Sequence, residues 1–562
     1  MLVDQVRRLG RTITERPQRY AGFGADVVRG AWNSRVLQPM RPDRAARLLF
    51  PVARFGMTPA TAGAVAALRH PDRIAVIDER GELTFAELEH RAAALATALR
   101  ARVAEGRRIG ILCRNHRGFI EAALAASRLG HDVVLLNTDF SAKQLSDVLD
   151  RESIGALVLD EEFDALLDDA SFAGAMVTAW HDGPSRNPTI DELVAATEPE
   201  PLVAERTTRM IILTSGTTGT PKGAQHDLSI GAIIPAVLTH LVRVPLRSGE
   251  PIVIGPPLFH VLGFAYLMSG LALGLPVVLR RKFEAKQALD AIARHRAGAL
   301  VVVPVMLRRI LEVPPSARPG TPSLRVVVCG GAALHTELSL AFMDAFGDVL
   351  HNVYGATETG WATISTPGDL RAAPGTVGRP SLCLTLRILK PGGGEAAAGE
   401  TGEIFVGGGL KFAGYTGGGG KEVRDGLTST GDLGHLDEEG RLFIDGRADD
   451  MIVSGGENVF PSEVEDLLEG HDGVAEVAVV GVDDEKFGQR LVAHVVRSGG
   501  GSGDGPGDGP GDGPGDGEVT EDELKDYVRR HLARYKVPRE FFFVDELPRT
   551  TTGKIKHRAL RG

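Results

Sequence analysis

The sequence predicts a mixed α/β protein with a large N-terminal domain and a small α+β domain at the C-terminal end. Short apolar runs typical of buried strands alternate with helical patterns through the first part of the chain, which favours layers of helices on parallel sheets. Beyond about residue 380, short strands separated by glycine turns predict a β-rich subdomain. A boundary is then expected at 446–450 (GRADD), before the small domain.

The elements are expected in the following order. A strand is predicted at Ile109–Leu112, then a helix ending near Leu129 and a strand at Asp132–Leu136. Further strands of the large domain are expected at Ala299–Val303, Leu324–Val328, Leu384–Leu389, Glu403–Val406 and Leu442–Asp445. The small domain is expected to contain strands at Val474–Val482 and Arg490–Val496, and helices at Ser462–Leu468 and Thr520–Leu532.

The uncharged stretch Pro251–Leu279 is long enough to cross a bilayer. Pro256, Pro257 and Pro276 interrupt it, however, and glycines break up the remainder. We therefore expect a strand, a loop, a core helix and a second strand here instead of a membrane span.

Composition narrows the possible partners. The chain has 562 residues and a formal net charge of −10, which gives no reason to expect nucleic acid. Its cysteines, Cys113, Cys329 and Cys383, are far apart and predict buried thiols in a reducing cytoplasm.

Two segments lie outside the predicted cores. Residues 1–58 form an N-terminal extension that is rich in arginine near its start and lacks the apolar core of a secretory signal. We interpret it as a solvated extension; a transit-peptide-like or membrane-surface role is left open. Residues 498–517 repeat GDGP without apolar side chains, so we expect a disordered surface insertion within the small domain.

The stretch TSGTTGTPKG at 214–223 follows an apolar strand and predicts a phosphate-binding loop. Glycines let the backbone approach closely, N–H groups and hydroxyls donate hydrogen bonds, and a lysine supplies charge. The Walker pattern needs Gly-Lys followed by Ser or Thr, whereas Lys222 lies between Pro221 and Gly223. A nucleotide triphosphate site of another kind is therefore indicated.

Other motifs supply the remaining parts of such a site. NVYGATETG at 352–360 offers an aromatic ring and a carboxylate, and STGDL at 429–433 offers an aspartate in a predicted turn. GRADDMI at 446–452 and TTTGKIK at 550–556 add an arginine and a lysine. Together they provide a phosphate cradle, a base-stacking ring, a metal carboxylate and a ribose clamp.

These motifs, with SGGENVFPSEVE at 454–465 and PRTTTGKIK at 548–556, resemble in order the acyl-adenylate-forming, or AMP-binding, superfamily. The resemblance runs from about residue 60 to the end. It implies an adenylate-forming domain over 59–447 and a small mobile domain over 448–562. It also implies activation of an acid with ATP and Mg²⁺, and acyl transfer to coenzyme A.

The resemblance assigns roles to individual residues. The phosphate loop would comprise Thr214, Ser215, Gly216, Thr217, Thr218, Gly219 and Lys222. Tyr354 and Gly355 would face adenine opposite Gly330, Gly331, Ala332 and Ala333, while Asp432 and Arg447 would bind the ribose. Thr357 would contact the α-phosphate, Glu358 would hold Mg²⁺, and Lys554 would be the catalytic lysine. Asp449 would be the hinge, and Gly455, Gly456 and Glu457 would line the coenzyme A channel.

The acid is predicted from PPLFHVLG at 256–263. Phe259 and His260 stand where amino-acid-activating relatives commonly place an aspartate, and Gly360 and Trp361 lie in an apolar neighbourhood with one bulky ring. This texture most resembles medium- or long-chain fatty acyl-CoA synthetases, so a fatty acid is predicted. An aryl-CoA ligase, an acyl-AMP ligase serving a carrier protein and a silent binding homologue are the alternatives. Peripheral membrane contact and a homodimer are left open.

Overall fold

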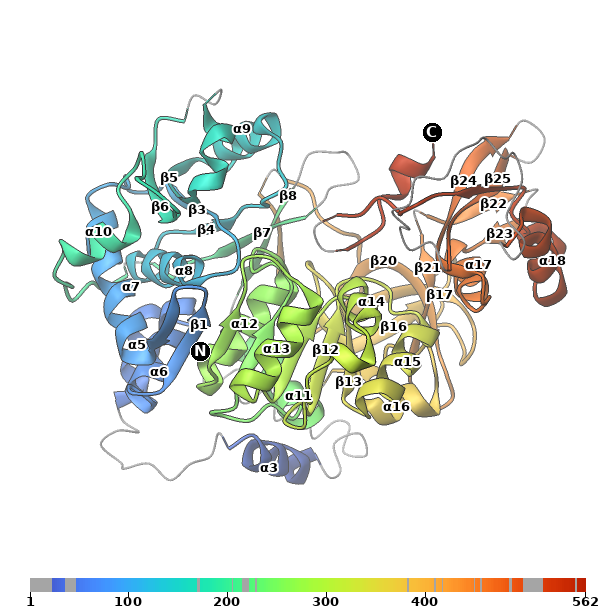
Figure 1. Cartoon of the computed structure of the whole chain (residues 1–562), viewed down its shortest axis with the longest axis horizontal. Coiled ribbons are helices and arrows are strands. Elements are labelled where there is room, and N and C mark those ends of the chain that lie inside the picture. The colour runs from blue at the N-terminus through green and yellow to red at the C-terminus, as the bar shows by residue number, and fades with distance from the viewer. Residues whose placement is uncertain are drawn as a thin grey trace.

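A computed structural model provides the structure of the chain. It describes residues 23–35, 47–168, 172–204, 206–214, 222–227, 230–381, 384–408, 411–416, 418–448, 450–454, 457–484, 488–498, 519–550 and 553–561. Its strands form several sheets, and helices cover the faces of the larger ones (Figure 1). The mixed α/β class predicted from the sequence, with a large N-terminal domain and a smaller C-terminal one, is confirmed.

The first sheet has a parallel centre and antiparallel edges. In spatial order its strands are β15 (Arg379–Pro380), β14 (Gly360–Ser365), β13 (Leu350–Ala356), β12 (Val326–Gly330), β11 (Ala299–Val302), β9 (Ile252–Ile254), β10 (Val277–Leu279), β1 (Ile74–Asp78) and β2 (Gly81–Thr84). All residues of β9, β10, β11 and β12 are buried. This is why they appear in the sequence as continuous apolar runs and not as alternating ones.

The second sheet is parallel from β7 to β6 and continues through antiparallel strands at its other edge. Its order is β18 (Lys411–Tyr415), β8 (Lys222–Asp227), β7 (Met210–Thr214), β4 (Val133–Leu135), β3 (Arg108–Leu112), β5 (Ile154–Asp160) and β6 (Ala175–Trp180). The strand predicted to feed the phosphate loop is therefore β7, beside the buried strand β4.

The predicted β-rich subdomain is a third, antiparallel sheet. It contains β16 (Thr385–Leu389), β17 (Gly402–Gly407), β20 (Leu427–Leu436), β19 (Val423–Arg424) and β21 (Leu442–Arg447). A fourth sheet lies on the right of Figure 1 and contains β23 (Glu457–Val459), β22 (Ile452–Ser454), β25 (Gly488–Arg497), β24 (Val474–Asp484) and β26 (Glu540–Phe543). The domain limits 59–447 and 448–562 stay a prediction, and the GDGP repeat lies almost entirely outside the described residues.

Local signals in the sequence fix where many helices begin. The helices are α3 (Phe23–Asn33), α5 (Leu49–Phe55), α6 (Pro59–Arg69), α7 (Phe85–Arg100), α8 (Arg117–Leu129), α9 (Ala142–Arg151), α10 (Ile190–Ala195), α11 (Ile230–Arg243), α12 (Val261–Leu273), α13 (Ala285–His295), α14 (Pro304–Glu312), α15 (Thr336–Phe346), α16 (Pro367–Ala372), α17 (Pro461–Glu469) and α18 (Glu521–His531). Short 3₁₀ turns are η1 (Glu161–Leu167), η2 (Pro315–Ala317), η3 (Arg534–Lys536) and η4 (His557–Leu560). At α7, for example, Thr84 and Glu87 form a reciprocal capping box that satisfies backbone donors at the helix start.

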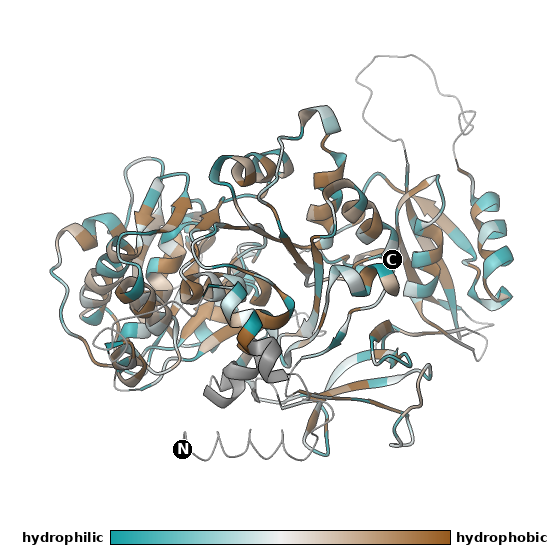
Figure 2. Ribbon diagram, turned by 90° about the horizontal axis from the view of Figure 1, so that it is seen from below, coloured by the Kyte–Doolittle hydropathy of each residue, from teal (hydrophilic) through white to brown (hydrophobic). Residues whose placement is uncertain are grey.

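The uncharged stretch Pro251–Leu279 folds as predicted, into β9, a loop, α12 and β10. In the part of the chain that the structure describes, every helix is too short or too polar to cross a membrane. Figure 2 shows the hydrophobic residues concentrated on strands and on inward helix faces. The apolar centre of Pro251–Leu279 is thus used to fill the interior between layers.

The prediction that the N-terminal extension is solvated is wrong for helix α3, which packs on the large domain. Within it, α3 packs on α11 so closely that a Cβ on Gly30 would lie 2.5 Å from the carbonyl oxygen of Leu241. Ala31 and Ser34 are buried in the same contact. The sequence of the extension is dominated by scattered arginines and shows no apolar periodicity from which this packing could be predicted.

Candidate active site

The segments predicted to face adenine come from two neighbouring parallel strands, β12 and β13. Gly330 closes β12 and pairs in register with Val353 of β13, the residue before Tyr354. A Cβ on Gly330 would lie 2.6 Å from the carbonyl oxygen of Val353, so a side chain there would force the strands apart. Gly331, Ala332 and Ala333 follow directly, which places them beside the YGATETG segment. Carboxyl ends of parallel strands are the usual location of ligand sites in such sheets.

Asp432 and Tyr354 meet across two different sheets. The Tyr354 hydroxyl donates to Asp432 Oδ2 at 2.6 Å, and Arg447 Nη1 donates to Oδ1 at 3.2 Å. Burial raises the pKa of Asp432, while Tyr354, Arg447 and Lys554 act in the opposite direction. The predicted ribose clamp is therefore assembled together with the predicted stacking ring.

The predicted turn at STGDL is wrong. Asp432 lies inside strand β20 and pairs in register with Arg447 of β21. Gly431 has a φ of +79°, which the sequence signal for a turn reflects. Pairing with β17 on one side and β21 on the other overrides that local preference.

A tight hairpin presents Thr357 and Glu358. Gly355 pairs with Trp361 across this hairpin. A Cβ on Gly355 would lie only 2.0 Å from the carbonyl oxygen of Gly360, which itself has a φ of +67°. Both glycines are thus required by the turn that projects Glu358.

Glu358 has a partner that the sequence did not predict. Tyr415 of β18 donates its hydroxyl to Glu358 Oε1 at 2.6 Å, and Glu358 is only 8% exposed. The Lys222 ammonium lies 5.6 Å from the centre of the Tyr415 ring. Tyr415 thereby connects the predicted metal carboxylate to the predicted phosphate-loop lysine. The sequence shows a tyrosine after a glycine at 414–415, but no local pattern indicates that this tyrosine contacts Glu358.

The ends of the phosphate loop lie opposite one another. Thr214 is the last residue of β7 and pairs with Lys222, the first residue of β8. The loop residues Ser215, Gly216, Thr217, Thr218 and Gly219 lie outside the described residues. The described strands therefore fix where the predicted loop starts and returns, and the roles of its residues stay predictions.

Lys554 reaches this site from the small domain. Its backbone N–H donates to Thr550 Oγ1 at 3.1 Å, and Gly553 packs on Val305 of α14. Although Lys554 is exposed, the surrounding protein lowers the pKa of its ammonium and Arg447 lowers it further. Asp432 and Glu358 oppose this shift, so the ammonium lies within electrostatic reach of both carboxylates.

Phe259 and His260 lie at the start of α12 with their rings 4.4 Å apart. The buried Nε2 atom of His260 has no hydrogen-bond partner among the described residues. Burial and the nearby Lys554 charge lower the pKa of His260 to about 3, so its ring is neutral. A neutral ring with an unsatisfied nitrogen suits a substrate oxygen or a wall position and does not suit a cationic role.

The ring cluster beside these residues is larger than predicted. Trp361 contacts His240 of α11 at 4.0 Å and Tyr266 of α12 at 6.1 Å between ring centres. The Tyr266 hydroxyl and His240 Nε2 are 3.0 Å apart. Sequence analysis identified one bulky ring and missed the other two, which come from helices far apart in the chain.

Most residues of the predicted hinge and coenzyme A channel lie outside the described part of the chain. Asp449, Gly455 and Gly456 lie outside the described residues. Glu457 begins β23, with its backbone paired to Ser454. Their roles stay predictions.

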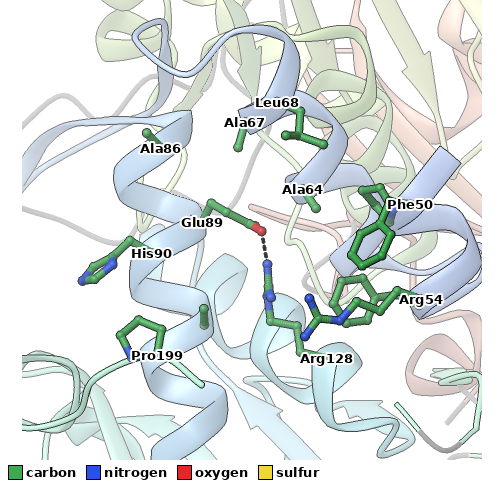
Figure 3. A pocket seen from close by; sticks show the side chains of 13 residues that line it. Phe50, Arg54, Ala64, Ala67, Leu68, Ala86, Glu89, His90, Arg128 and Pro199 are labelled. Atoms are coloured by element: carbon green, nitrogen blue, oxygen red, sulfur yellow. Dashed lines mark hydrogen bonds and ion pairs between the residues drawn. The ribbon is translucent and has the colours of Figure 1, made fainter. Parts of the chain in front are cut away.

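Two other features are separate from this site. The pocket in Figure 3 lies among α5, α6, α7 and α8, with the Glu89–Arg128 ion pair at its centre and Arg54 beside it. Cys113, His116 and Asp160 form a buried cluster with metal-ligand atoms. Both His116 nitrogens are engaged, by Asp160 at 2.7 Å and by the Gly118 N–H at 3.1 Å, so hydrogen bonding accounts for that cluster.

The chain matches the model of the AMP-binding enzyme family over residues 64–416 and that of the AMP-binding enzyme C-terminal domain over residues 463–554. The protein belongs to the AMP-binding enzyme family. This confirms the resemblance inferred from the motifs.

Similar proteins within the family span nearly the whole chain. The 2-succinylbenzoate–CoA ligase of Bacillus cereus (strain ATCC 10987 / NRS 248) is 33% identical over 500 residues, covering 87% of this chain and 96% of the relative. The o-succinylbenzoate CoA synthetase MenE from Bacillus subtilis, solved with the acyl-adenylate intermediate OSB-AMP, has a TM-score of 0.75 and 30% identity. That match covers 89% of this chain and 98% of MenE.

A third relative is named for a different activity. The amide bond synthetase McbA from Marinactinospora thermotolerans has a TM-score of 0.76 and 29% identity, covering 90% of this chain and 99% of McbA. Among these three relatives of the AMP-binding enzyme described here, none is a fatty acid ligase. The prediction of a fatty acid substrate therefore gains no support from them.

Proposed function

We propose that this AMP-binding enzyme is an acid–thiol ligase that forms an acyl-adenylate from ATP and then transfers the acyl group to coenzyme A. The observation that carries the proposal is the hydrogen-bonded set of Tyr354, Asp432 and Arg447, together with the packing of the Lys554 loop on α14 of the large domain through Gly553. A carboxylate attacks the α-phosphate, the bond from that phosphorus to pyrophosphate breaks, and the thiol later displaces AMP. The developing phosphoryl charge needs fixed cations and positioned donors more than a protein nucleophile.

Each residue has a definite task in this reaction. Lys554 would place its ammonium at the phosphoryl oxygens, and Asp432 would accept hydrogen bonds from ribose hydroxyls. Glu358 is a buried carboxylate held by Tyr415, and such an oxygen donor fits Mg²⁺. When bound, the ion would neutralise phosphate charge. Thr357, on the same hairpin, would contact the α-phosphate.

For the acid we favour an aromatic substrate, and o-succinylbenzoate is the first compound to test. Full-length similarity to the 2-succinylbenzoate–CoA ligase of Bacillus cereus supports this choice. The cluster of Trp361, His240 and Tyr266 also supports it, because these rings offer faces and edges to another ring. The aryl-CoA ligase alternative thus replaces the fatty acid as the leading prediction.

The acceptor is a separate question. Coenzyme A is proposed because the similar 2-succinylbenzoate–CoA ligase is named for coenzyme A as its acceptor. The similarity to McbA makes an amine the second candidate acceptor, since that protein is an amide bond synthetase. Cytoplasmic location, membrane contact and a homodimer stay predictions.

Acid-dependent ATP–pyrophosphate exchange tests the first half of the reaction. Exchange should be strongest with o-succinylbenzoate, weaker with benzoate and laurate, and absent without an acid. Lys554→Ala provides the matched inactive protein. Exchange driven best by laurate would restore the fatty acid prediction, and no exchange with any acid would favour the silent homologue.

The second half is tested by adding coenzyme A or a primary amine to the preformed adenylate. Thioester formation with coenzyme A supports the ligase proposal. Amide formation with no thioester would contradict coenzyme A as the acceptor.

A further inference from the structure

The small domain presents acidic side chains to the large domain next to Lys554. Asp466 and Glu469 lie on α17, and Glu476 lies at the start of β24. Opposite them in the large domain lie Arg308 of α14 and His335, the N-cap residue of α15. Figure 1 shows α14 and α15 on the side of the large domain that faces α17.

Arg308 contacts the small domain at three points. Its Nε lies 3.3 Å from Glu476 Oε1, its Nη2 lies 3.6 Å from Glu469 Oε1, and Nη1 donates to the carbonyl oxygen of Ala475. Glu469 and Glu476 are 9% and 15% exposed at the side chain. Because these carboxylates are shielded from water, their attraction to Arg308 is stronger than that of a fully exposed pair.

A continuous series of contacts connects Arg308 to the residue beside Lys554. Glu476 Oε2 lies 2.8 Å from Arg549 Nη2, and Arg549 Nη1 donates to the carbonyl oxygen of Gly553 at 2.7 Å. Gly553 in turn packs on Val305, one turn before Arg308 on α14. The helix that carries Arg308 therefore contacts the Lys554 loop directly and through Glu476.

His335 forms the second contact between the domains. Its Nδ1 lies 2.6 Å from Asp466 Oδ1 and 3.5 Å from Glu469 Oε2. Arg308 and His335 thus share Glu469. Close by, Gly470 of the small domain approaches the side chain of Glu337, since a Cβ on Gly470 would lie 2.8 Å from Glu337 Oε1.

We propose that Arg308 and His335 are positioning residues for the first half-reaction, holding the small domain so that the Lys554 loop stays packed against α14 of the large domain. This inference rests on the proposed function for its consequence in catalysis. The two residues are remote from the phosphate loop along the chain and act through the Lys554 loop. A small number of ion pairs suits this task, because under the proposed function the small domain would leave this position for the thiol step.

The His335 contact should weaken as the pH rises. Burial lowers the pKa of His335, but Asp466, Glu469 and Glu465 on α17 outweigh it and raise the value to about 9. Glu337, on the same helix as His335, is a further acidic neighbour. The contact is complete below the ordinary histidine pKa of about 6.5 and is lost as the pH rises through about 9.

The first test separates the two half-reactions in the full-length enzyme. Arg308→Ala should lower acid-dependent pyrophosphate exchange about 10-fold, leaving thioester formation from supplied acyl-AMP and coenzyme A unchanged or faster. Arg308→Lys should recover part of the exchange. Arg309→Ala is the matched control, because Arg309 neighbours Arg308 on α14 and is exposed. Equal losses in both half-reactions, or no loss of exchange, would overturn the proposal.

The pH profile tests His335 separately. In the wild type, the ratio of exchange to thioester formation should fall between pH 7 and pH 9. Lys554 also titrates as the pH rises, so the comparison is made with His335→Gln, which keeps Lys554. A ratio with the same pH dependence in both proteins would contradict the role of His335.

A second measurement needs no substrate and remains informative if the proposed function fails. In V305C/G553C the new Cβ on residue 553 would lie 3.4 Å from the Cβ of residue 305, about the separation in a disulfide. Residue 553 has a φ of +78°, so a cysteine there is strained, and all rates are therefore compared within this double-cysteine protein. The rate of disulfide formation then reports how often the small domain occupies this orientation. Adding Arg308→Ala should slow it several-fold, whereas adding Arg309→Ala should not. Equal rates would overturn the proposal, while a missing exchange activity in the wild type would contradict only the ligase function.

Discussion

The nucleotide wall and the Lys554 loop contribute to one site in very different ways. Tyr354, Glu358 and Asp432 come from strands or a hairpin of the large domain, and their polar atoms are bound to protein partners. Lys554 lies on an exposed loop of the small domain and is brought to the site by ion pairs around Arg308 and by the packing of Gly553. One part of the site is built into sheets, and the other depends on how two domains meet.

This difference indicates which part can change during the reaction. Moving Asp432 away from Tyr354 would require unpairing β20 from β21. Moving Lys554 away requires that the ion pairs of Arg308 and His335, the packing of Gly553 on Val305 and the contact of α17 with β21 separate, while β20 and β21 stay paired. In a site of this kind, the residues that bind the nucleotide can stay in place while the small-domain segment that faces them is replaced by another.

The largest expected effect comes from removing the ammonium of Lys554. Lys554→Ala should lower adenylate formation by about 10²–10³-fold, by analogy with the loss of one donor to developing charge. Conversion of supplied acyl-AMP and coenzyme A to thioester should persist. The two rates are measured separately, with Lys556→Ala as the neighbouring control. If Lys554→Ala slowed both steps alike, Lys554 would belong to the fixed part of the site.

The protonation of Lys554 provides a second test of its role in adenylate formation. The surrounding protein and Arg447 lower the pKa of its ammonium, and only the protonated form supplies positive charge. Adenylate formation should therefore decline with rising pH before an unperturbed lysine, with a pKa of about 10.4, would lose its proton. A pH profile of pyrophosphate exchange, compared with that of the thioester step, measures this decline. Exchange that stayed constant to pH 10 would contradict it.

A smaller effect is expected in the nucleotide wall. Asp432→Ala removes the acceptor of the Tyr354 hydroxyl and the predicted ribose hydrogen bonds. Hydrogen bonds to charged groups contribute about 1.5–3 kcal/mol, so KM for ATP should rise roughly 10- to 100-fold. Asp437→Ala, in a hairpin of the same sheet, is the control. An unchanged KM for ATP would remove Asp432 from the ribose site.

Tyr415→Phe should have a more moderate effect. The change keeps the ring near Lys222 but removes the hydroxyl that donates to Glu358. One such hydrogen bond predicts about a 10-fold loss of adenylate formation. Titration with Mg²⁺ should show a higher requirement, and nucleotide binding by calorimetry gives an independent readout. Tyr535→Phe, at an exposed tyrosine, is the control; equal behaviour of both variants would count against Tyr415.

The smallest effect is expected from residues 499–517. They contain no apolar side chain that could pack, and the described chain is anchored at β25 before them and at α18 after them. Replacing them with a short Gly-Ser linker should leave both half-reactions and the melting temperature nearly unchanged. A large loss of either would show that the repeat has a partner.

The sequence by itself determined the elements whose signals are local. Continuous apolar runs identified the buried strands β9, β10 and β11, because parallel strands covered on both faces have no polar side. Glycine, hydroxyl and charge patterns identified the segments around Tyr354, Glu358, Asp432 and Lys554, since a phosphate-binding site needs those groups close together along each segment. The family followed from the order of these motifs.

Only the tertiary structure decided which segments meet. Tyr415 reaches Glu358 from another sheet, and His240 and Tyr266 reach Trp361 from two helices. Arg308 and His335 reach acidic residues of the small domain that are more than 100 positions away in the chain. The physical reason is that a hydrogen bond or an ion pair depends on the distance between atoms in space. Residues far apart in the chain acquire that proximity only through the packing of sheets and domains.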